Sequence, residues 1–210
     1  EKGGRIFKLQ SMLKANNIKT KAAHESLEDT RATKNLCSLL FKRAPEVFNA
    51  AIALRRKNDV LEKIKDGIFC WHEAWREAKI HCGAYFGEHI FPGWYLLWDL
   101  RQDVNDILNI ANNRDELAKS ISRPGKYIRT LKSNRAPIIM SSKHALMEDV
   151  YKKISMKVLE KRYLTLKQHR DELSEKVRDI MQEKYNEKKD SDQSAKEPEE
   201  KIYSLNPTQD

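Results

Sequence analysis

Apolar side chains recur every three or four residues at both ends of the chain, the spacing that places them on one face of a helix. Val150, Ile154 and Val158 form one such stripe in the last third. Pro45 interrupts the pattern near the start, because proline cannot continue a helix. The predicted helices span residues 6–16, 22–43, 48–64 and 142–185.

Between residues 67 and 140 the pattern changes to short apolar runs separated by turn-forming residues. All four tryptophans and five of the seven glycines lie there. This pattern predicts a β-rich segment in which Gly83, Gly87 and Gly93 mark turns. The other elements expected there are one helix, which begins at Asp103 or Asp115 and ends at Ile121, and a closing hairpin of residues 127–131 and 137–140.

These elements together predict an α+β fold, followed by a solvated linker over residues 190–201, which carry no apolar side chain larger than alanine. The formal charge of the 210 residues is +9. Residues 183–210 hold 8 acids and 5 bases, so the basic excess lies in the part expected to fold. A surface of this sign favours polyanions, with nucleic acid before membrane, although a generally basic protein without such a partner has the same composition.

Membrane insertion and export are not indicated. The longest uncharged run of interest, residues 90–98, has about half the length of a spanning helix. The three cysteines, an odd number at irregular spacing, are typical of reduced thiols in the cytoplasm. Cys70 and Cys82 could form a zinc site with His72 and His81, but adjacent residues of a strand face opposite sides, which argues against a shared site.

Five bases recur at intervals of three residues, with no acid between them. Such a stripe could follow a phosphate backbone, although a strand cannot keep a period of three on one face, and a solvated basic loop is the alternative. Trp75, next to Arg76 and Lys79, is the best candidate among the tryptophans for stacking on a base, although tryptophan is more often a core or rim residue. The stripe consists of Arg123, Lys126, Arg129, Lys132 and Arg135.

His24 and Asp29 form a possible catalytic pair at the start of the second helix. A histidine with a pKa near neutrality can take a proton from water, and a carboxylate on the first helical turn can bind a divalent cation. The spacing alone is weak evidence. The acids there could merely complement the helix N-terminus, with His24 on the surface.

The segments around this pair resemble the end of the catalytic domain of bacterial exodeoxyribonuclease I. The matching residues are Phe7-Lys8-Leu9, Lys14-Ala15-Asn16-Asn17-Ile18, and His24 with Asp29, Ala32 and Thr33. The similarity continues, in the order expected of that family, at Ala74-Trp75-Arg76, Trp98-Asp99-Leu100, the segment 137–140 and Glu175-Lys176-Val177.

The resemblance implies a magnesium-dependent enzyme that removes nucleotides from the 3′ end of single-stranded DNA in repair and recombination. In that family a ribonuclease-H-like domain binds two magnesium ions through four acids and uses a histidine. By resemblance, His24 is the general base and Asp29 the last metal ligand. Single-stranded DNA and single-stranded DNA-binding protein are the partners to expect of a cytoplasmic monomer.

The sequence departs from the family at one decisive point. The first two acids of the family form an Asp-x-Glu pair on an upstream strand, and no Asp-x-Glu occurs in these 210 residues. Two metals need several carboxylates to offset their charge, so the chain alone is expected to be inactive. The chain is therefore expected to be one part of a longer enzyme of this family. The alternatives are a non-catalytic single-strand-binding module and a helical protein–protein adaptor.

The resemblance also predicts how the chain is divided. The expected parts are the end of the exonuclease domain (1–46), a Src-homology-3-like accessory barrel with a leading helix (47–141), a helical segment (142–188), and a linker with the start of a helical C-terminal domain (189–210).

Overall fold

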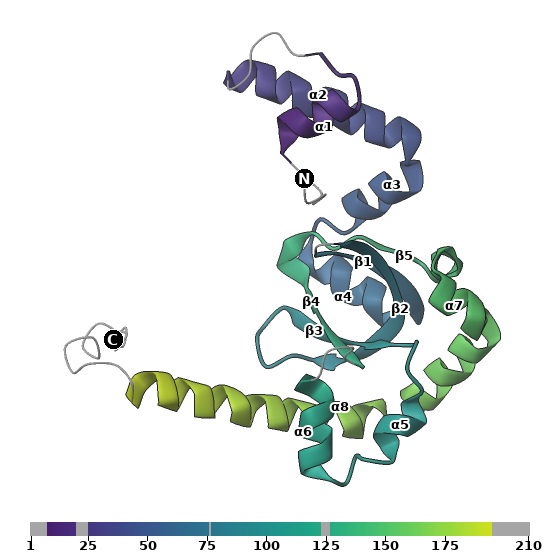
Figure 1. The fold of residues 1–210 in the computed structure, drawn as a ribbon, viewed down its shortest axis with the longest axis vertical. Helices are drawn as coiled ribbons and strands as arrows, with labels where there is room; N and C mark the ends of the chain where they lie inside the picture. Colours follow the sequence, from purple (N-terminus) through teal and green to yellow (C-terminus); the bar gives the residue numbers. More distant parts are fainter. Residues whose placement is uncertain (1–7, 20–24, 76, 123–126, 195–210) are drawn as a thin grey trace.

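A computed structural model describes residues 8–19, 25–75, 77–122 and 127–194 (Figure 1). Helices at both ends flank one five-stranded antiparallel sheet, which confirms the mixed α+β class. In chain order the elements are α1 (Leu9–Ala15), α2 (Ser26–Arg43), α3 (Pro45–Ala53), α4 (Lys57–Lys65), β1 (Ile68–Trp75), β2 (Glu77–Glu88), β3 (Trp94–Asp99), α5 (Val104–Leu108), α6 (Arg114–Ser122), β4 (Ile128–Lys132), the 3₁₀ helix η1 (Ser133–Arg135), β5 (Ile139–Ser141), the 3₁₀ helix η2 (Ser142–Met147), α7 (Asp149–Ile154) and α8 (Met156–Ser194).

The N-terminal helices form a small unit at one end of the molecule (Figure 1). Leu13 of α1 packs against Ala32 and Leu36 of α2 in a cluster separate from the sheet. The predicted single helix over 48–64 is wrong, because α3 ends at Ala53 and α4 begins at Lys57. A capping interaction starts α4: the Asp59 carboxylate accepts a hydrogen bond from the Arg56 backbone N–H at 3.3 Å.

The sheet has the order β4-β3-β2-β1-β5, with neighbours antiparallel. The predicted closing hairpin of residues 127–131 and 137–140 is therefore wrong, since β4 and β5 lie at opposite edges. β4 pairs with β3, and β5 pairs with β1. The region expected to hold one helix holds two, α5 and α6.

Two apolar cores lie on the two faces of the sheet, because successive strand residues face opposite sides. Figure 1 shows the curved sheet enclosing α4 on its concave side, where Val60 and Ile64 pack against Leu97. On the other face, Trp98 belongs to a core completed by helices α5 to α8. Five buried residues of α8 line that core: Leu159, Leu166, Leu173, Val177 and Ile180.

Gly83 and Gly87 lie within β2 rather than in the predicted turns. A Cβ atom on Gly83 would lie 2.0 Å from the Trp98 carbonyl oxygen and 2.8 Å from the Trp71 ring, so the glycine lets the two tryptophans approach the strand. Gly87 follows a β-bulge, where the register against β3 shifts. Gly93 does lie in a turn, with a φ of 75° that favours glycine.

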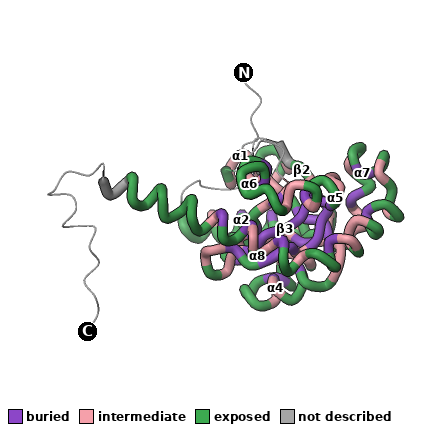
Figure 2. The backbone as a smooth tube through the Cα atoms, turned by 90° about the horizontal axis from the view of Figure 1, so that it is seen from below, coloured by how far each residue is buried: buried purple, intermediate pink, exposed green. Residues whose placement is uncertain are grey.

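Helix α8 has 39 residues and continues past the body of the molecule. Figure 2 shows its C-terminal part as an exposed rod, and residues 182–191 are all exposed. The linker expected from residue 190 is therefore helical as far as Ser194. Within the described ranges, no helix is long and apolar enough to cross a membrane.

Candidate functional site

The predicted catalytic segment lies at the start of α2. Asp29 is half-buried on the first turn, where its Oδ1 accepts a hydrogen bond from Gln10 Nε2 of α1 at 3.5 Å. His24 lies outside the described residues. The pairing of His24 with Asp29 therefore stays a prediction.

A metal centre is not formed by the described residues alone. Among them, no group of three or more His, Cys, Asp or Glu side chains could hold a metal ion. Glu28, beside Asp29, forms an ion pair of 2.7 Å with Arg31. Cys70 and Cys82 pair across β1 and β2 and are buried in the core that packs on α8.

The basic stripe does not lie on one surface in the part that is described. Arg129 and Lys132 are an odd number of residues apart on β4, so they face opposite sides of the sheet. Arg135 is exposed on η1. Arg123 and Lys126 lie outside the described residues.

The second predicted group surrounds the β1–β2 connection. Lys79 is exposed and is the cross-strand partner of Glu73. Arg76 and the side chain of Trp75 lie outside what the structure describes. Their role in stacking and phosphate binding stays a prediction.

Arg129 belongs to a buried ion-pair network that sequence reasoning missed. Its Nε donates to Asp99 Oδ2 at 3.2 Å and its Nη1 donates to Glu73 Oε2 at 3.1 Å. Asp99, with 0 % exposure, also accepts from Arg101 Nη2 at 2.8 Å and from the Tyr151 hydroxyl at 2.8 Å. The network therefore joins β1, β3, β4 and α7.

His81 lies between the two carboxylates, with Nδ1 3.3 Å from Asp99 Oδ2 and Nε2 3.5 Å from Glu73 Oε2. Burial alone would lower the pKa of His81, but its hydrogen bonds to Asp99 and Glu73 outweigh this and raise it. Burial alone would raise the pKa of Asp99, but the His81 hydrogen bond and the Arg101 charge hold that pKa well below its usual range. Both shifts favour the charged pair.

An aromatic cluster lies at the β2–β3 connection, where it meets α8. The Phe91 ring contacts Trp94 edge-on, with 5.0 Å between centroids, and Tyr185 of α8 contacts Phe91 in the same manner at 5.2 Å. The Lys132 ammonium lies over the Trp94 ring, 3.3 Å from its centroid. Of the predicted binding residues, Lys132 is thus next to an aromatic ring, although the ring belongs to Trp94 and not to Trp75.

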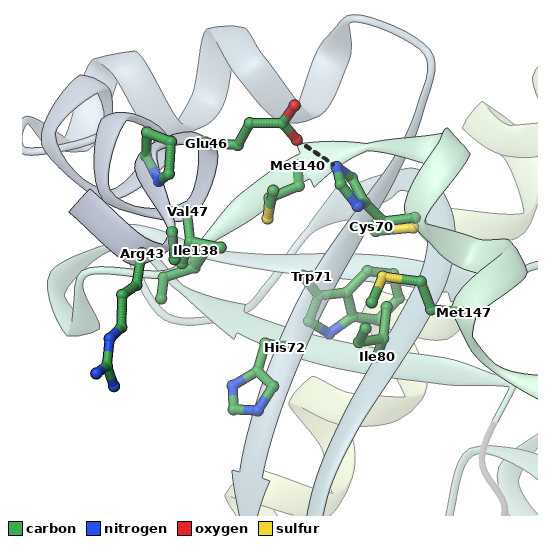
Figure 3. A pocket seen from close by; sticks show the side chains of 13 residues that line it. Arg43, Glu46, Val47, Cys70, Trp71, His72, Ile80, Ile138, Met140 and Met147 are labelled. Carbon is green, nitrogen blue, oxygen red and sulfur yellow. Dashed lines mark ion pairs between the residues drawn. The ribbon is translucent and has the colours of Figure 1, made fainter. Parts of the chain in front are cut away.

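An apolar groove of about 490 Å³ separates the N-terminal helices from the sheet. Figure 3 shows Ile138, Met140 and Met147 lining it, with Arg43 and His72 among its polar residues. An ion pair of 3.3 Å between Glu46 Oε2 and His144 Nε2 closes one side. The groove is suited to an apolar ligand with a few polar groups.

Comparisons with known proteins point to one family. No protein-family model matches the chain. The chain is 28% identical over 163 residues to an exodeoxyribonuclease I of Buchnera aphidicola (Baizongia pistaciae strain Bp), covering 68% of this chain and 31% of that protein.

Solved structures give the same result for the fold. An exonuclease I from Methylocaldum szegediense matches 85% of this chain with a TM-score of 0.64 and 22% identity, over 41% of its own length. An E. coli exonuclease I in complex with a dT13 oligonucleotide matches 86% with a TM-score of 0.60 and 21% identity, over 42% of its length. A structure described as SSB/exonuclease I with an inhibitor matches 86% at 19% identity, with a TM-score of 0.61 over 40% of its chain.

The resemblance inferred from the sequence is confirmed by these matches, over part of the relatives' length. The chain spans about a third of the curated relative and about two-fifths of the solved chains.

Proposed function

We propose, from its relationship to exodeoxyribonuclease I in sequence and fold, that this chain is part of a magnesium-dependent exodeoxyribonuclease that degrades single-stranded DNA from the 3′ end. Repair and recombination are the processes in which such an enzyme would act. The observation that carries the proposal is that the sequence match and the fold match, over 68% and 85% of the chain, both point to the same enzyme.

The finer division of the chain is part of this proposal. Helices α1 and α2 would end a ribonuclease-H-like exonuclease domain. The curved sheet with α4 in its concave face would be a Src-homology-3-like accessory barrel, which fits its five short antiparallel strands. Helix α8 would then lead toward a helical C-terminal domain.

The described residues do not by themselves fit a two-metal site, because no group of metal-ligating side chains gathers among them. Asp29 would need carboxylates from outside those residues to hold magnesium. His24 would act as the general base. The chain on its own would therefore bind single-stranded DNA without cleaving it.

The two partners proposed are single-stranded DNA and a single-stranded DNA-binding protein. A structural neighbour was solved with a dT13 oligonucleotide, and another is described as a complex with SSB. The formal charge of +9 supports the first partner, since basic surfaces attract the phosphate backbone.

The test is to mix the purified 210-residue chain with a labelled single-stranded oligonucleotide and magnesium. We expect binding that weakens as salt rises, measured by fluorescence anisotropy, and no release of nucleotides on a denaturing gel. Absence of binding would contradict the proposal. Nucleotide release that survives Asp29→Ala would contradict the metal-ligand assignment.

A non-catalytic single-strand-binding module is the second candidate, because the described residues hold no metal site. The reading frame before Glu1 separates the two. An Asp-x-Glu strand encoded there supports the enzyme, and its absence supports the module.

A further inference from the structure

The aromatic cluster at the β2–β3 connection carries a more specific inference. We propose that Trp94, Phe91 and Tyr185, with Lys132 and Arg135, form a platform on which a base of a single-stranded nucleic acid stacks. This inference rests on the proposed function, and it names a place on the molecule where the strand is held.

The rings come from two elements that meet in space. Phe91 and Trp94 lie at the β2–β3 connection, whereas Tyr185 lies on α8 just where that helix begins to leave the body. Tyr185 is 43 % exposed, and Phe91 and Trp94 are partly exposed. Aromatic surface therefore remains open to solvent instead of being enclosed in the core.

The fourth ring of the cluster is the buried imidazole of His89. His89 stacks on Phe91 with 5.2 Å between ring centroids and lies 5.1 Å from Trp94. Its Nδ1 accepts a hydrogen bond from the Phe91 backbone N–H at 3.1 Å. Burial and the charge of Lys132 lower the pKa of His89, so this buried ring supports Phe91 and Trp94 without placing a charge beside them at neutral pH.

Two cations flank the rings. The Lys132 ammonium lies over Trp94, and Arg135 is close enough that, with loss of solvent, its charge lowers the pKa of Lys132. Three carboxylates lie next to the cluster in sequence. Glu88 accepts a hydrogen bond from the Tyr85 hydroxyl at 3.0 Å, Glu183 forms an ion pair with Arg114, and Glu187 is exposed on α8. Flat rings beside two positive charges match a base linked to phosphates.

The position of Lys132 suggests how the site would fill. The ammonium covers the Trp94 face through an electrostatic attraction to the ring. A lysine side chain is long and flexible, so it can turn from the ring to a phosphate. A base would then take the exposed indole face while the ammonium pairs with the adjoining phosphate. The base and the phosphate of one nucleotide are thus both bound when the Lys132 ammonium moves from the ring to the phosphate.

The first experiment measures binding of the full 210-residue chain to a labelled deoxythymidine oligonucleotide by fluorescence anisotropy. Trp94→Ala should weaken affinity by about five- to 150-fold, the range for loss of one stacked base. Trp94→Phe, which keeps a flat ring, should recover most of the loss. Lys132→Gln should make the slope of log affinity against log salt shallower by about 0.7.

A matched control separates stacking from a general loss of aromatic surface. Phe41 on α2 is 51 % exposed and contacts the Phe48 ring at 5.5 Å, far from the platform in the chain. Phe41→Ala should leave the affinity unchanged. An equal loss in Phe41→Ala, or unchanged affinity in a folded Trp94→Ala, would overturn the platform, whereas absence of binding by the unaltered chain would overturn the proposed function as well.

A second measurement uses the unaltered chain and so does not depend on a variant that folds. An oligonucleotide carrying 5-bromodeoxyuridine is irradiated in the complex, and the cross-linked peptide is identified by mass spectrometry. We expect cross-links at Trp94 or Tyr185. Cross-links confined to aromatic residues elsewhere would overturn the assignment.

Discussion

Replacing Asp99 with asparagine should test whether the buried ion-pair network holds the sheet together. Asp99 has 0 % exposure and accepts hydrogen bonds from Arg101, Arg129 and Tyr151, while His81 lies 3.3 Å away. The asparagine keeps the size of the side chain but removes the charge. The two arginines and His81 would then lose their common buried partner.

The expected loss is about 3–5 kcal/mol of unfolding free energy, the usual cost when one member of a buried ion pair is removed. At roughly 2–4 °C for each kcal/mol in a chain of this size, the melting temperature should fall by about 6–20 °C. Urea unfolding followed by tryptophan fluorescence measures the loss, since the buried Trp71 and Trp98 report on both cores. The slope of free energy against urea should stay unchanged.

The pH dependence supplies an independent check on the same variant. Because the pKa of Asp99 is depressed in the folded state, its contribution is present above the unfolded pKa of about 3.9 and is lost as pH falls through the folded value. The difference in unfolding free energy between the unaltered chain and Asp99→Asn should therefore persist at pH 5 and narrow below about pH 4.

Asp149→Asn is the matched control, because Asp149 forms an exposed pair with Lys152 on α7, and such pairs contribute little. If Asp99→Asn cost no more than Asp149→Asn, the buried network would have no measurable part in stability and the reasoning would be refuted.

Three further predictions concern single side chains. His81 has a raised pKa, so its contribution to the unfolding free energy is complete below about pH 6.5 and is lost as pH rises through the folded value. In His81→Gln the unfolding free energy measured in urea should therefore fall less across that pH range. Gly83→Ala should cost at least about 1–3 kcal/mol in thermal unfolding, because its Cβ would meet the Trp98 carbonyl oxygen at 2.0 Å, and a neutral result would mean that the strands can part. Arg135→Ala should reduce the salt slope of oligonucleotide binding by about 0.7 without changing the melting temperature, and an unchanged slope would place Arg135 outside the DNA path.

The sequence predicted the elements whose signal is local. Apolar spacing located α2, since a helix buries one stripe of its own residues. The single helix predicted over 142–185 is wrong, because η2, α7 and α8 occupy that range and Ser155, with a φ of 70°, separates α7 from α8. The break also divides the predicted stripe, and Val150 and Val158 are exposed.

Apolar spacing also did not show the break between α3 and α4, because the Asp59 cap is one interaction in an otherwise helical pattern. The sequence places Gly83 in a turn, whereas the structure places it within β2, because Trp71 and Trp98, which leave no room for a Cβ atom there, come from other strands.

Pairings between distant residues lay beyond sequence reasoning for a physical reason. Arg129 was predicted to bind phosphate from the spacing of bases, yet it meets Glu73, which lies 56 residues earlier in the chain. Only the folded sheet brings these two side chains together. The role of Arg129 toward nucleic acid stays a prediction, as does the role of His24. The family resemblance, by contrast, is confirmed, because several short motifs in the expected order carry more information than one contact.

The free end of α8 sets a distance and a direction for whatever is joined to it. Nine described residues follow Tyr185, whose ring still contacts Phe91, and at 1.5 Å a residue they extend about 14 Å from the body. A helix turns by about 100° with each residue, so deleting one residue would swing the attached segment to another side of the molecule. Deleting seven would keep its direction and shorten the reach by about 10 Å. The number of residues in this part of α8 therefore sets the distance and direction of the attached segment, and matters more for both than which residues they are.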